Sequence, residues 1–332
     1  ENQLDGIVSF TAPLVVPSSL AALEVMKTSV GSAEASYETA EAVLLTAVAQ
    51  AFFAAAISDE ILGARQSSIE VARATARDAQ TRFAAGAVTR VDVDRAALAL
   101  VRAEQAEREA RFGREQAYRA LATLVQAQAA FRVAGLPPSE APSQPQELAS
   151  ALQLRPEFRA IELLARSHVA ERRAHAWRWA PGLSAFGNAR VFNYDNFARK
   201  RHAWAIGLAL DWVLFDGGTR DALRHAAAAQ AREAEARAEA LRDAIRDELT
   251  NASALLETKR HAHEAAERSV VLAGETLARV RVQYEAGTIA QLDLLQAQDG
   301  LVAAREALAQ AHFELALADL GVRRAAGTFP GK

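Results

Sequence analysis

The strongest constraint in this chain is an internal duplication. Residues 83–96 match residues 284–297 at one constant offset, and each segment carries a glycine within an otherwise helix-like stretch. A constant offset over several positions indicates that a unit has been duplicated. We therefore expect two tandem structural repeats. The matching pairs are Phe83/Tyr284, Gly86/Gly287, Val88/Ile289, Asp92/Asp293 and Ala96/Ala297.

Very long helices are predicted on both sides of these glycines. Residues 18–85 contain no proline and only two glycines, which allows one helix of up to about 100 Å. Apolar residues make up 51% of the chain but aromatic residues only 6%, because alanine is abundant, and this composition is typical of long helices. Gly86 and Gly287 would supply the backbone that reverses each helix hairpin. The predicted helices cover residues 18–85, 91–134, 156–179, 219–286 and 291–324.

The last predicted helix carries a heptad repeat. A period of seven predicts left-handed supercoiling, and a seam of alanines lets two helices approach closely. The expected fold class is therefore mainly α, with long antiparallel coiled-coil hairpins. Simple hairpins packed in a bundle are the alternative. One seam consists of Leu294, Leu301, Leu308, Leu315 and Val322, and the other of Ala297, Ala304, Ala311 and Ala318.

The chain is expected to divide at a segment rich in proline and serine that begins near Gly135. Residues 1–135 form the first repeat, with an end strand and a long helical hairpin. Residues 136–155 form a linker or equatorial segment. The second repeat, residues 156–332, contains a short helix, a β-hairpin over 183–215 and a long helical hairpin over 219–324.

The clearest strand pattern lies in residues 203–215, where large apolar side chains alternate with mostly small ones. Tryptophan stands near both ends of the apolar row. This alternation is typical of a transmembrane β-strand with interfacial aromatics, for which about ten residues suffice. Residues 183–192 and 7–16 are further strand candidates, and a soluble sheet edge packed on helices is the alternative. The predicted lipid-facing residues are Trp204, Ile206, Leu208, Leu210 and Trp212.

Composition excludes several classes of function. The chain has no cysteine, which removes disulfides, thiol catalysis and zinc sites built from cysteine. Its net charge of −3 gives no reason to expect nucleic acid as a partner. The most apolar run, residues 43–57, is shorter than the roughly 20 residues of a spanning helix, and we expect it to be buried helix.

A search for catalytic or metal-binding residues gives no site. His168 and His175 lie too far apart along one helix to share an ion. His261 and His263 point to different faces of a helix. The sequence shows no catalytic triad order, phosphate loop or plausible carboxylate pair. We therefore expect neither an enzyme nor a bound metal or cofactor.

Four short motifs carry a resemblance to a known family. With the duplicated order of elements, they make nearly the whole chain similar to the TolC-like outer membrane factor family (outer membrane efflux proteins). These are the exit ducts of tripartite efflux pumps and type I secretion systems. The motifs are Tyr284-x-x-Gly287 followed by Asp293-Leu294-Leu295-x-Ala297, the weaker copy Phe83-x-x-Gly86 followed by Asp92-Val93-x-x-Ala96, Leu214-Phe215-Asp216-Gly217-Gly218, and Arg155-Pro156-Glu157.

The resemblance implies a homotrimer in the cell outer membrane, with a large periplasmic part. Strands of the three copies would join into a small membrane β-barrel, and the hairpins would form an α-barrel around a periplasmic tunnel. The implied function is passive transport of drugs or secreted substrates across periplasm and outer membrane. Implied partners are outer-membrane lipid, a periplasmic adaptor (membrane fusion protein) and an inner-membrane transporter of RND or ABC type. A non-conducting periplasmic coiled-coil scaffold or adaptor is the alternative.

One departure from the family concerns the N-terminal end. In the family each half begins with a short helix and a strand, whereas the first half here opens at its second strand. Truncation is one explanation for the absence of these first elements from the sequence. The loop that includes Arg199, Lys200, Arg201 and His202 is expected to be solvated, or to touch lipopolysaccharide phosphates.

The resemblance also implies where the functional residues lie. Both glycine breaks would form the periplasmic tip, where the adaptor docks and the channel constricts. The expected gate residues are Asp293, Asp92 and Tyr284. A local alternative for the acids is helix capping, because Thr89 to Asp92 and Thr288 to Gln291 have capping-box spacing. The expected adaptor contacts are Gly86, Ala87, Val88, Gly287, Thr288 and Ile289.

Overall fold

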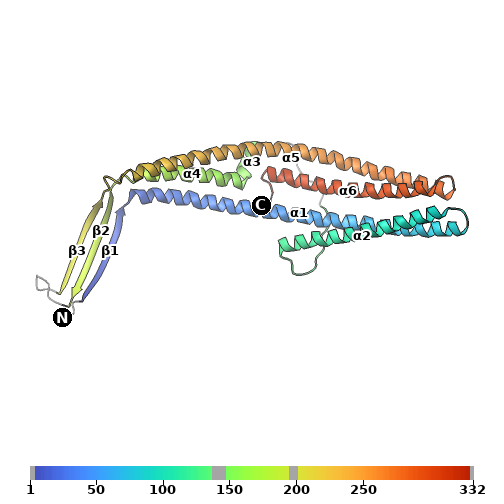
Figure 1. Cartoon of the computed structure of the whole chain (residues 1–332). Coiled ribbons are helices and arrows are strands. Elements are labelled where there is room, and N and C mark those ends of the chain that lie inside the picture. The colour runs from blue at the N-terminus through green and yellow to red at the C-terminus, as the bar shows by residue number, and fades with distance from the viewer. Residues whose placement is uncertain (1–3, 137–146, 194–200, 330–332) are drawn as a thin grey trace. The chain divides into compact units, whose positions relative to one another are not determined.

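The computed structural model describes residues 4–136, 147–193 and 201–329. The fold is mainly α, and the predicted order of strand, long helix, glycine turn and long helix occurs twice. By its internal contacts the chain divides into two units, residues 1–39 with 155–244 and residues 40–154 with 245–332. In chain order the elements are β1 (Asp5–Val15), α1 (Pro17–Ala84), α2 (Arg90–Val125), α3 (Leu148–Leu154), α4 (Pro156–Trp177), β2 (Gly182–Phe192), β3 (His202–Asp211), α5 (Thr219–Glu285) and α6 (Gln291–Ala325) (Figure 1).

The first unit holds a three-stranded antiparallel sheet in the order β1-β2-β3. Its register pairs Phe10 with Gly187 and Gly187 with Ile206, so these three positions lie on one face. Because side chains alternate along a strand, every second residue shares that face. We call it the apolar face. It carries Val8, Phe10 and Ala12 of β1, Leu183, Ala185, Gly187 and Ala189 of β2, and Trp204, Ile206, Leu208 and Leu210 of β3.

The opposite face carries smaller and more polar side chains, and we call it the small face. The ring of Phe186 packs on it against the backbone of Gly207, where an added Cβ would lie 2.8 Å from the ring. Gly207 is therefore needed for this close approach of an aromatic ring. The small face carries Ile7, Ser9, Thr11 and Pro13 of β1, Ser184, Phe186, Asn188 and Arg190 of β2, and Ala203, Ala205, Gly207 and Ala209 of β3.

Strand β3 ends four residues earlier than predicted. Its last pairing is between Asp211 and Gly182, and β2 has no residue beyond Gly182 to continue the ladder. Pro181, which precedes Gly182, lacks the N–H that another rung would need. Trp212, which we predicted within the strand, instead follows it, and its indole Nε1 donates to the Trp179 carbonyl at 3.1 Å.

The core of the second unit is built mainly from alanine and leucine seams. Ala96 is 1% exposed and packs with Ala79 and Val93 between α1 and α2. Leu315 and Val322 of α6, two positions of the predicted leucine seam, are likewise buried. The alanines let the paired helices approach closely, and the leucine and valine side chains fill the space between them, as the heptad pattern predicts.

Helix α2 ends at Val125, so the prediction of helix to residue 134 was wrong. Gln126 adopts a left-handed backbone with φ of 53° and terminates the helix. The following segment turns back, because the Val133 N–H donates to the Tyr118 hydroxyl at 3.3 Å and Phe131 packs 5.7 Å from the Tyr118 ring.

The predicted linker over residues 136–155 contains a helix that sequence reasoning missed. Helix α3 covers Leu148–Leu154, while residues 137–146 of the linker lie outside the described part of the chain. Ala151 is fully buried against Leu249 of α5 and against Ala325 and Ala326 at the end of α6. The short helix therefore belongs to the packed core of the second unit.

One polar cluster holds the far end of the α1–α2 hairpin together. Asp59 of α1 accepts hydrogen bonds from the Tyr118 hydroxyl at 2.5 Å and from the Arg114 guanidinium, both on α2. Arg114 also lies over the Tyr118 ring, 4.5 Å from its centroid. Burial raises the pKa of Asp59, but the hydrogen bonds from Tyr118 and Arg114 outweigh this, so its pKa lies below its usual range.

Replacing Asp59 with asparagine should lower the free energy of unfolding by about 1.5–3 kcal/mol, because two hydrogen bonds to a charged group are weakened. A carboxyl with a lowered pKa stabilises the fold above its unfolded pKa of about 3.9 and loses this effect as pH falls. The difference between wild type and Asp59→Asn should therefore shrink below about pH 4. Urea unfolding at pH 7 and pH 3 measures it. The exposed neighbour Glu60→Gln is the control, and an equal loss for both variants would contradict the role of the cluster.

Helix α1 also contains the apolar run of residues 43–57. One 18-residue window of α1 is apolar enough to cross a membrane by length and composition, and 22% of it is buried. The expectation of a buried helix holds for only part of this run in the single chain. Ala55 and Ile57 are buried, but Val43 and Leu44 are exposed at 52% each.

Candidate functional sites in the sheet and at the hairpin tips

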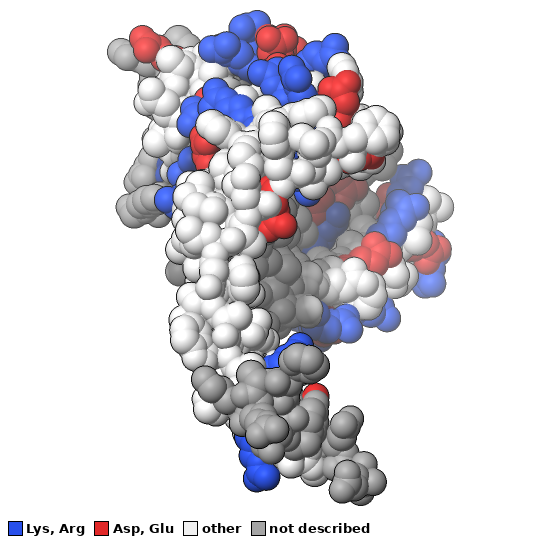
Figure 2. Space-filling model, turned by 90° about the vertical axis from the view of Figure 1, so that its left-hand side faces the viewer, with Lys and Arg blue, Asp and Glu red and all other residues white. Residues whose placement is uncertain are grey.

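The apolar face of the sheet is exposed in this chain. Ile206 and Leu208 are 72% and 67% exposed, and Trp204 reaches 72%. Figure 2 shows the molecule from the end that carries the sheet, with a broad white area of uncharged residues along its left side and charged side chains above, below and to the right of it. A contiguous apolar surface of this kind marks contact with lipid or with another protein. The row continues into Trp212, which is exposed but lies beyond the strand.

The tips of the two helical hairpins, both in the second unit, have the same backbone turn. Gly86 and Gly287 have φ of 72° and 74°, the left-handed region that favours glycine. In the first turn the Gly86 N–H donates to the Phe83 carbonyl at 2.9 Å, and in the second the Gly287 N–H donates to the Tyr284 carbonyl at 3.0 Å. The next N–H, of Ala87 or Thr288, donates to the carbonyl five residues back in both turns. These are Schellman turns, repeated by the duplication.

The tip side chains predicted to contact a partner are largely exposed. Ala87 and Thr288 are exposed together with the two glycines, whereas Val88 and Ile289 are half-buried. Apolar residues at these last two positions can therefore pack partly against their own hairpin. Exposed backbone and small side chains leave the turns open to a partner.

The predicted capping box at the start of α2 is confirmed. The Asp92 Oδ2 accepts from the Thr89 N–H at 3.0 Å and from its hydroxyl at 2.7 Å, and the Asp92 N–H donates to the Thr89 hydroxyl at 3.3 Å. These hydrogen bonds from Thr89 lower the pKa of Asp92. An acid in the first turn also interacts favourably with the helix dipole.

The predicted capping box between Thr288 and Gln291 is absent. Helix α6 begins after Ala290, the duplicate of Thr89, and the Ala290 N–H donates to Asp293 Oδ2 at 3.2 Å. Alanine has no hydroxyl that could accept a hydrogen bond from the Asp293 N–H. The Thr288 hydroxyl instead donates to the Gln283 carbonyl at 2.9 Å, at the end of α5. Asp293 is thus exposed and held by fewer hydrogen bonds than Asp92.

Tyr284, the third expected gate residue, joins the two hairpins. Its side chain is only 6% exposed, and its hydroxyl donates to Asp78 Oδ2 of α1 at 3.4 Å. The Arg82 guanidinium lies 4.5 Å from the centre of the ring and pairs with Asp78 at 2.9 Å. Burial raises the pKa of Tyr284 above its usual range. Sequence reasoning missed Asp78 and Arg82, although their spacing of four residues signals a helical ion pair.

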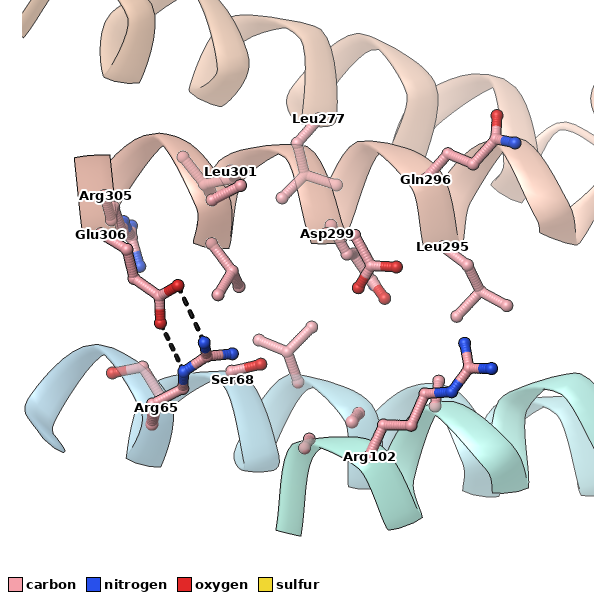
Figure 3. Close-up of a pocket in the computed structure, with 18 of the residues that line it drawn as sticks. Arg65, Ser68, Arg102, Leu277, Leu295, Gln296, Asp299, Leu301, Arg305 and Glu306 are labelled. Carbon is pink, nitrogen blue, oxygen red and sulfur yellow. Dashed lines mark hydrogen bonds and ion pairs between the residues drawn. The ribbon is translucent and has the colours of Figure 1, made fainter. Parts of the chain in front are cut away.

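Two further links join the hairpins beside a groove of about 500 Å³ (Figure 3). The Arg65 guanidinium donates to Glu306 Oε2 at 2.8 Å, and the Gln298 side-chain N–H donates to the Thr75 hydroxyl at 3.1 Å. Figure 3 shows Arg102 of α2 on the side of the groove that faces α6. With Tyr284, these links fix α1 of one hairpin against α5 and α6 of the other.

Two further expectations from the sequence concern metal-binding clusters and the basic loop before β3. Within residues 4–136, 147–193 and 201–329, no group of three or more His, Asp or Glu side chains is arranged to hold a metal ion. Arg199 and Lys200 of the basic loop lie outside the described residues. Arg201 and His202, at the start of β3, are exposed.

Comparisons with known proteins agree with this geometry. A family model described as Outer membrane efflux protein matches residues 2–126 and 148–328. A membrane protein from Pseudomonas aeruginosa is 20% identical with a TM-score of 0.84, over 98% of this chain and 80% of that chain. The outer membrane protein VceC of Vibrio cholerae is 18% identical with a TM-score of 0.82, over 98% of this chain and 87% of that chain. The MtrE outer membrane channel of Neisseria gonorrhoeae, in its open state, is 21% identical with a TM-score of 0.78, over 98% of this chain and 80% of that chain. No curated protein matches the chain.

Proposed function

We infer the function of this chain from its family, because the chain belongs to the outer membrane efflux proteins. It is an exit duct located in the outer membrane, with a large helical part in the periplasm. The family consists of channel proteins rather than enzymes. The single observation in this chain that carries the assignment is the exposed apolar face of the sheet, because a non-conducting scaffold has no need of a lipid-facing row.

We propose that the duct is a homotrimer whose sheets close into one barrel. Within the described residues, β1 and β3 are the edges of the sheet, and each edge leaves backbone N–H and C=O groups without a partner. Such groups cannot stay unpaired in lipid. Pairing of β3 in one copy with β1 in the next would close the ring and remove every edge. The apolar face would then contact lipid, and the small face would line the bore.

The first part of α1 supports the same assembly. Leu23, Val30 and Tyr37 recur at intervals of seven residues, and all three are more than half exposed. Apolar residues at this spacing are typical of a seam between packed helices. No described residue of the first unit covers them. The helix of a neighbouring copy is the partner we propose for this seam.

The trimer can be tested in native membranes. The complete mature protein should fractionate with the outer membrane and run as a trimer in mild detergent, which heating converts to a monomer. The double variant Leu23→Glu with Val30→Glu should weaken the trimer while the strands still insert. A monodisperse monomer that stays in solution without detergent would overturn the proposal.

We further propose that both tips meet a periplasmic adaptor and that an inner-membrane transporter of RND or ABC type supplies the energy. The support is the repeated Schellman turn, which presents the same exposed backbone twice in each chain. Gly86 and Ala87 would make this contact in the first hairpin, and Gly287 and Thr288 in the second. Cross-linking from a photoreactive residue at Ala87 or Thr288 in intact cells tests this proposal, and capture of no envelope protein from either position would contradict it.

For the gate, we propose that Asp293 acts on permeating ions while Asp92 serves mainly as a helix cap. The Asp92 carboxylate is already occupied by two hydrogen bonds from Thr89. Asp293 accepts one long bond and is exposed, so it keeps capacity for a cation. In a trimer each acid would occur three times around the axis, and rings of carboxylates favour cations in pores.

Replacing Asp293 with asparagine should lower cation selectivity and weaken block by multivalent cations. Asp92→Asn should change permeation less, and should instead lower the free energy of unfolding by about 1 kcal/mol through loss of the cap. The reversal potential in planar bilayers under a salt gradient measures the first effect, and thermal unfolding the second. If neither variant changes the reversal potential, both acids are caps only.

A further inference from the structure

A pair of histidines between the helices of the second hairpin has no part in the export function described above. His263 lies on α5 and His312 on α6, both within the second unit. Their ring centroids are 5.5 Å apart, and the ring planes are inclined by 60°. Both side chains are half-buried. The two positions are far apart in sequence, so only the hairpin fold brings the rings together.

The pair lies at a half-buried contact between α5 and α6. One heptad before His263, Leu256 is buried, and His312 stands between the buried Ala309 and Ala316. Leucine at either position would bury more apolar surface. Within the described residues, no hydrogen bond or ion pair involves His312. His312 thus keeps both ring nitrogens available beside the ring of His263.

The distance between the ring centres leaves room for one metal ion bound by both imidazoles. A metal about 2.1 Å from one nitrogen of each ring lies about 3.2 Å from each ring centre, and a tetrahedral angle then separates the centres by about 5.2 Å. The observed 5.5 Å requires an angle only slightly wider. No atom of either ring is both buried and without a partner, so an ion and its water ligands can reach the free nitrogens.

A carboxylate stands beside one of the rings. Glu267, one helical turn after His263, places Oε2 3.9 Å from His263 Nδ1. Histidines that bind a metal commonly donate their other N–H to a carboxylate, which orients the ring. A small rotation would bring Glu267 into hydrogen-bond range of Nδ1, leaving Nε2 of His263 for the ion.

We propose that His263 and His312 together bind one divalent transition-metal ion of the zinc or copper class, with water completing its coordination. Imidazole nitrogen is a preferred ligand of both metals. Because the two ligands come from different helices, the ion would tie α5 to α6 in the middle of the hairpin. Because the ion would bind the folded hairpin and not the unfolded chain, it would raise the thermal stability of the protein.

The test uses the full chain in detergent, with any affinity tag removed, and Zn²⁺ alone as the probe. Isothermal titration should give one zinc ion per chain with a dissociation constant in the micromolar range. Saturating zinc should raise the melting temperature by about 2–5 °C. His263→Ala and His312→Ala should each weaken binding at least tenfold and abolish the rise. His261→Ala is the matched control, because His261 is two residues away and 69% exposed, and it should behave as wild type.

A spectroscopic measurement separates this site from any other. With one equivalent of Cu²⁺, pulsed electron paramagnetic resonance should detect the remote nitrogens of two imidazoles in wild type and of one in each single variant. Glu171 contacts His168 and, separately, His175 on α4, and zinc bound by Glu171 with either one would survive substitution of His263 and His312. If His263→Ala and His312→Ala bind both metals as tightly as wild type, the pair only packs and the proposal is wrong.

Discussion

Placing arginine at Ile206 should prevent stable assembly of the protein in the outer membrane. Ile206 lies at the centre of β3 on the apolar face and is 72% exposed in the single chain. A charged side chain at the middle of a bilayer destabilises a transmembrane barrel by about 2–4 kcal/mol. We expect the heat-modifiable trimer of Ile206→Arg to fall several-fold in the outer-membrane fraction. Its urea midpoint in lipid vesicles should fall as well.

The adjacent residue provides the matched control. Ala205 lies on the small face and would point into a water-filled bore. Ala205→Arg should therefore assemble nearly as well as wild type, although it narrows the passage. Equal assembly of the two arginine variants would mean that the apolar face does not contact lipid, and equal failure would mean that both faces are packed against protein.

Truncating Tyr284 should loosen the second hairpin tip more than any single substitution at the first. The ring of Tyr284 is nearly fully buried, and removing a buried aromatic side chain costs about 3–5 kcal/mol. Amide hydrogen exchange over residues 284–290 should therefore accelerate strongly in Tyr284→Ala. If the tyrosine holds the tip closed, single-channel conductance should also rise.

The duplication offers a control at the equivalent position. Phe83 is 42% exposed, so Phe83→Ala should accelerate exchange at its own tip much less. Tyr284→Phe keeps the ring and loses only the long hydrogen bond to Asp78, which is worth about 0.5–1.5 kcal/mol. Equal acceleration in Tyr284→Ala and Phe83→Ala would contradict the importance of the buried ring.

Much of the fold could be predicted from sequence because its signals are local. The long helices lack proline, the turns require glycine with positive φ at Gly86 and Gly287, and the seams repeat every seven residues. The capping box of Thr89 and Asp92 follows the same logic, because three residues of spacing determine both hydrogen bonds. The gate, tip and lipid-facing roles stay predictions, since they depend on an assembly of several chains.

Apart from the absent capping box of Thr288 and Gln291, the errors arose mainly where a distant contact overrides a local pattern. The sequence pattern predicts helix over residues 127–134. Contacts of this segment with Tyr118, including that of Phe131, instead hold it folded back along α2, and no periodicity in the sequence indicates them. The strand β3 reads as apolar to Phe215, but its ladder ends where its partner strand begins at Gly182. His263 and His312 were missed for the same reason. Histidines on one helix can be compared by spacing, whereas a pair across a hairpin depends on the register of two helices.

The turn-by-turn packing of the two helices in each hairpin also determines how cooperatively the protein unfolds. In a long hairpin each helical turn contacts only its neighbouring turns and the turn opposite. Contacts are therefore local along the hairpin, as they are in repeat proteins. Opening the last turns of a tip breaks local contacts such as that of Tyr284 with Asp78, and leaves the core around Leu256 and Val322 intact. The free energy of opening therefore rises from the tip toward that core. If the tips form the gate proposed above, they could open repeatedly while the core around Leu256 and Val322 stays folded.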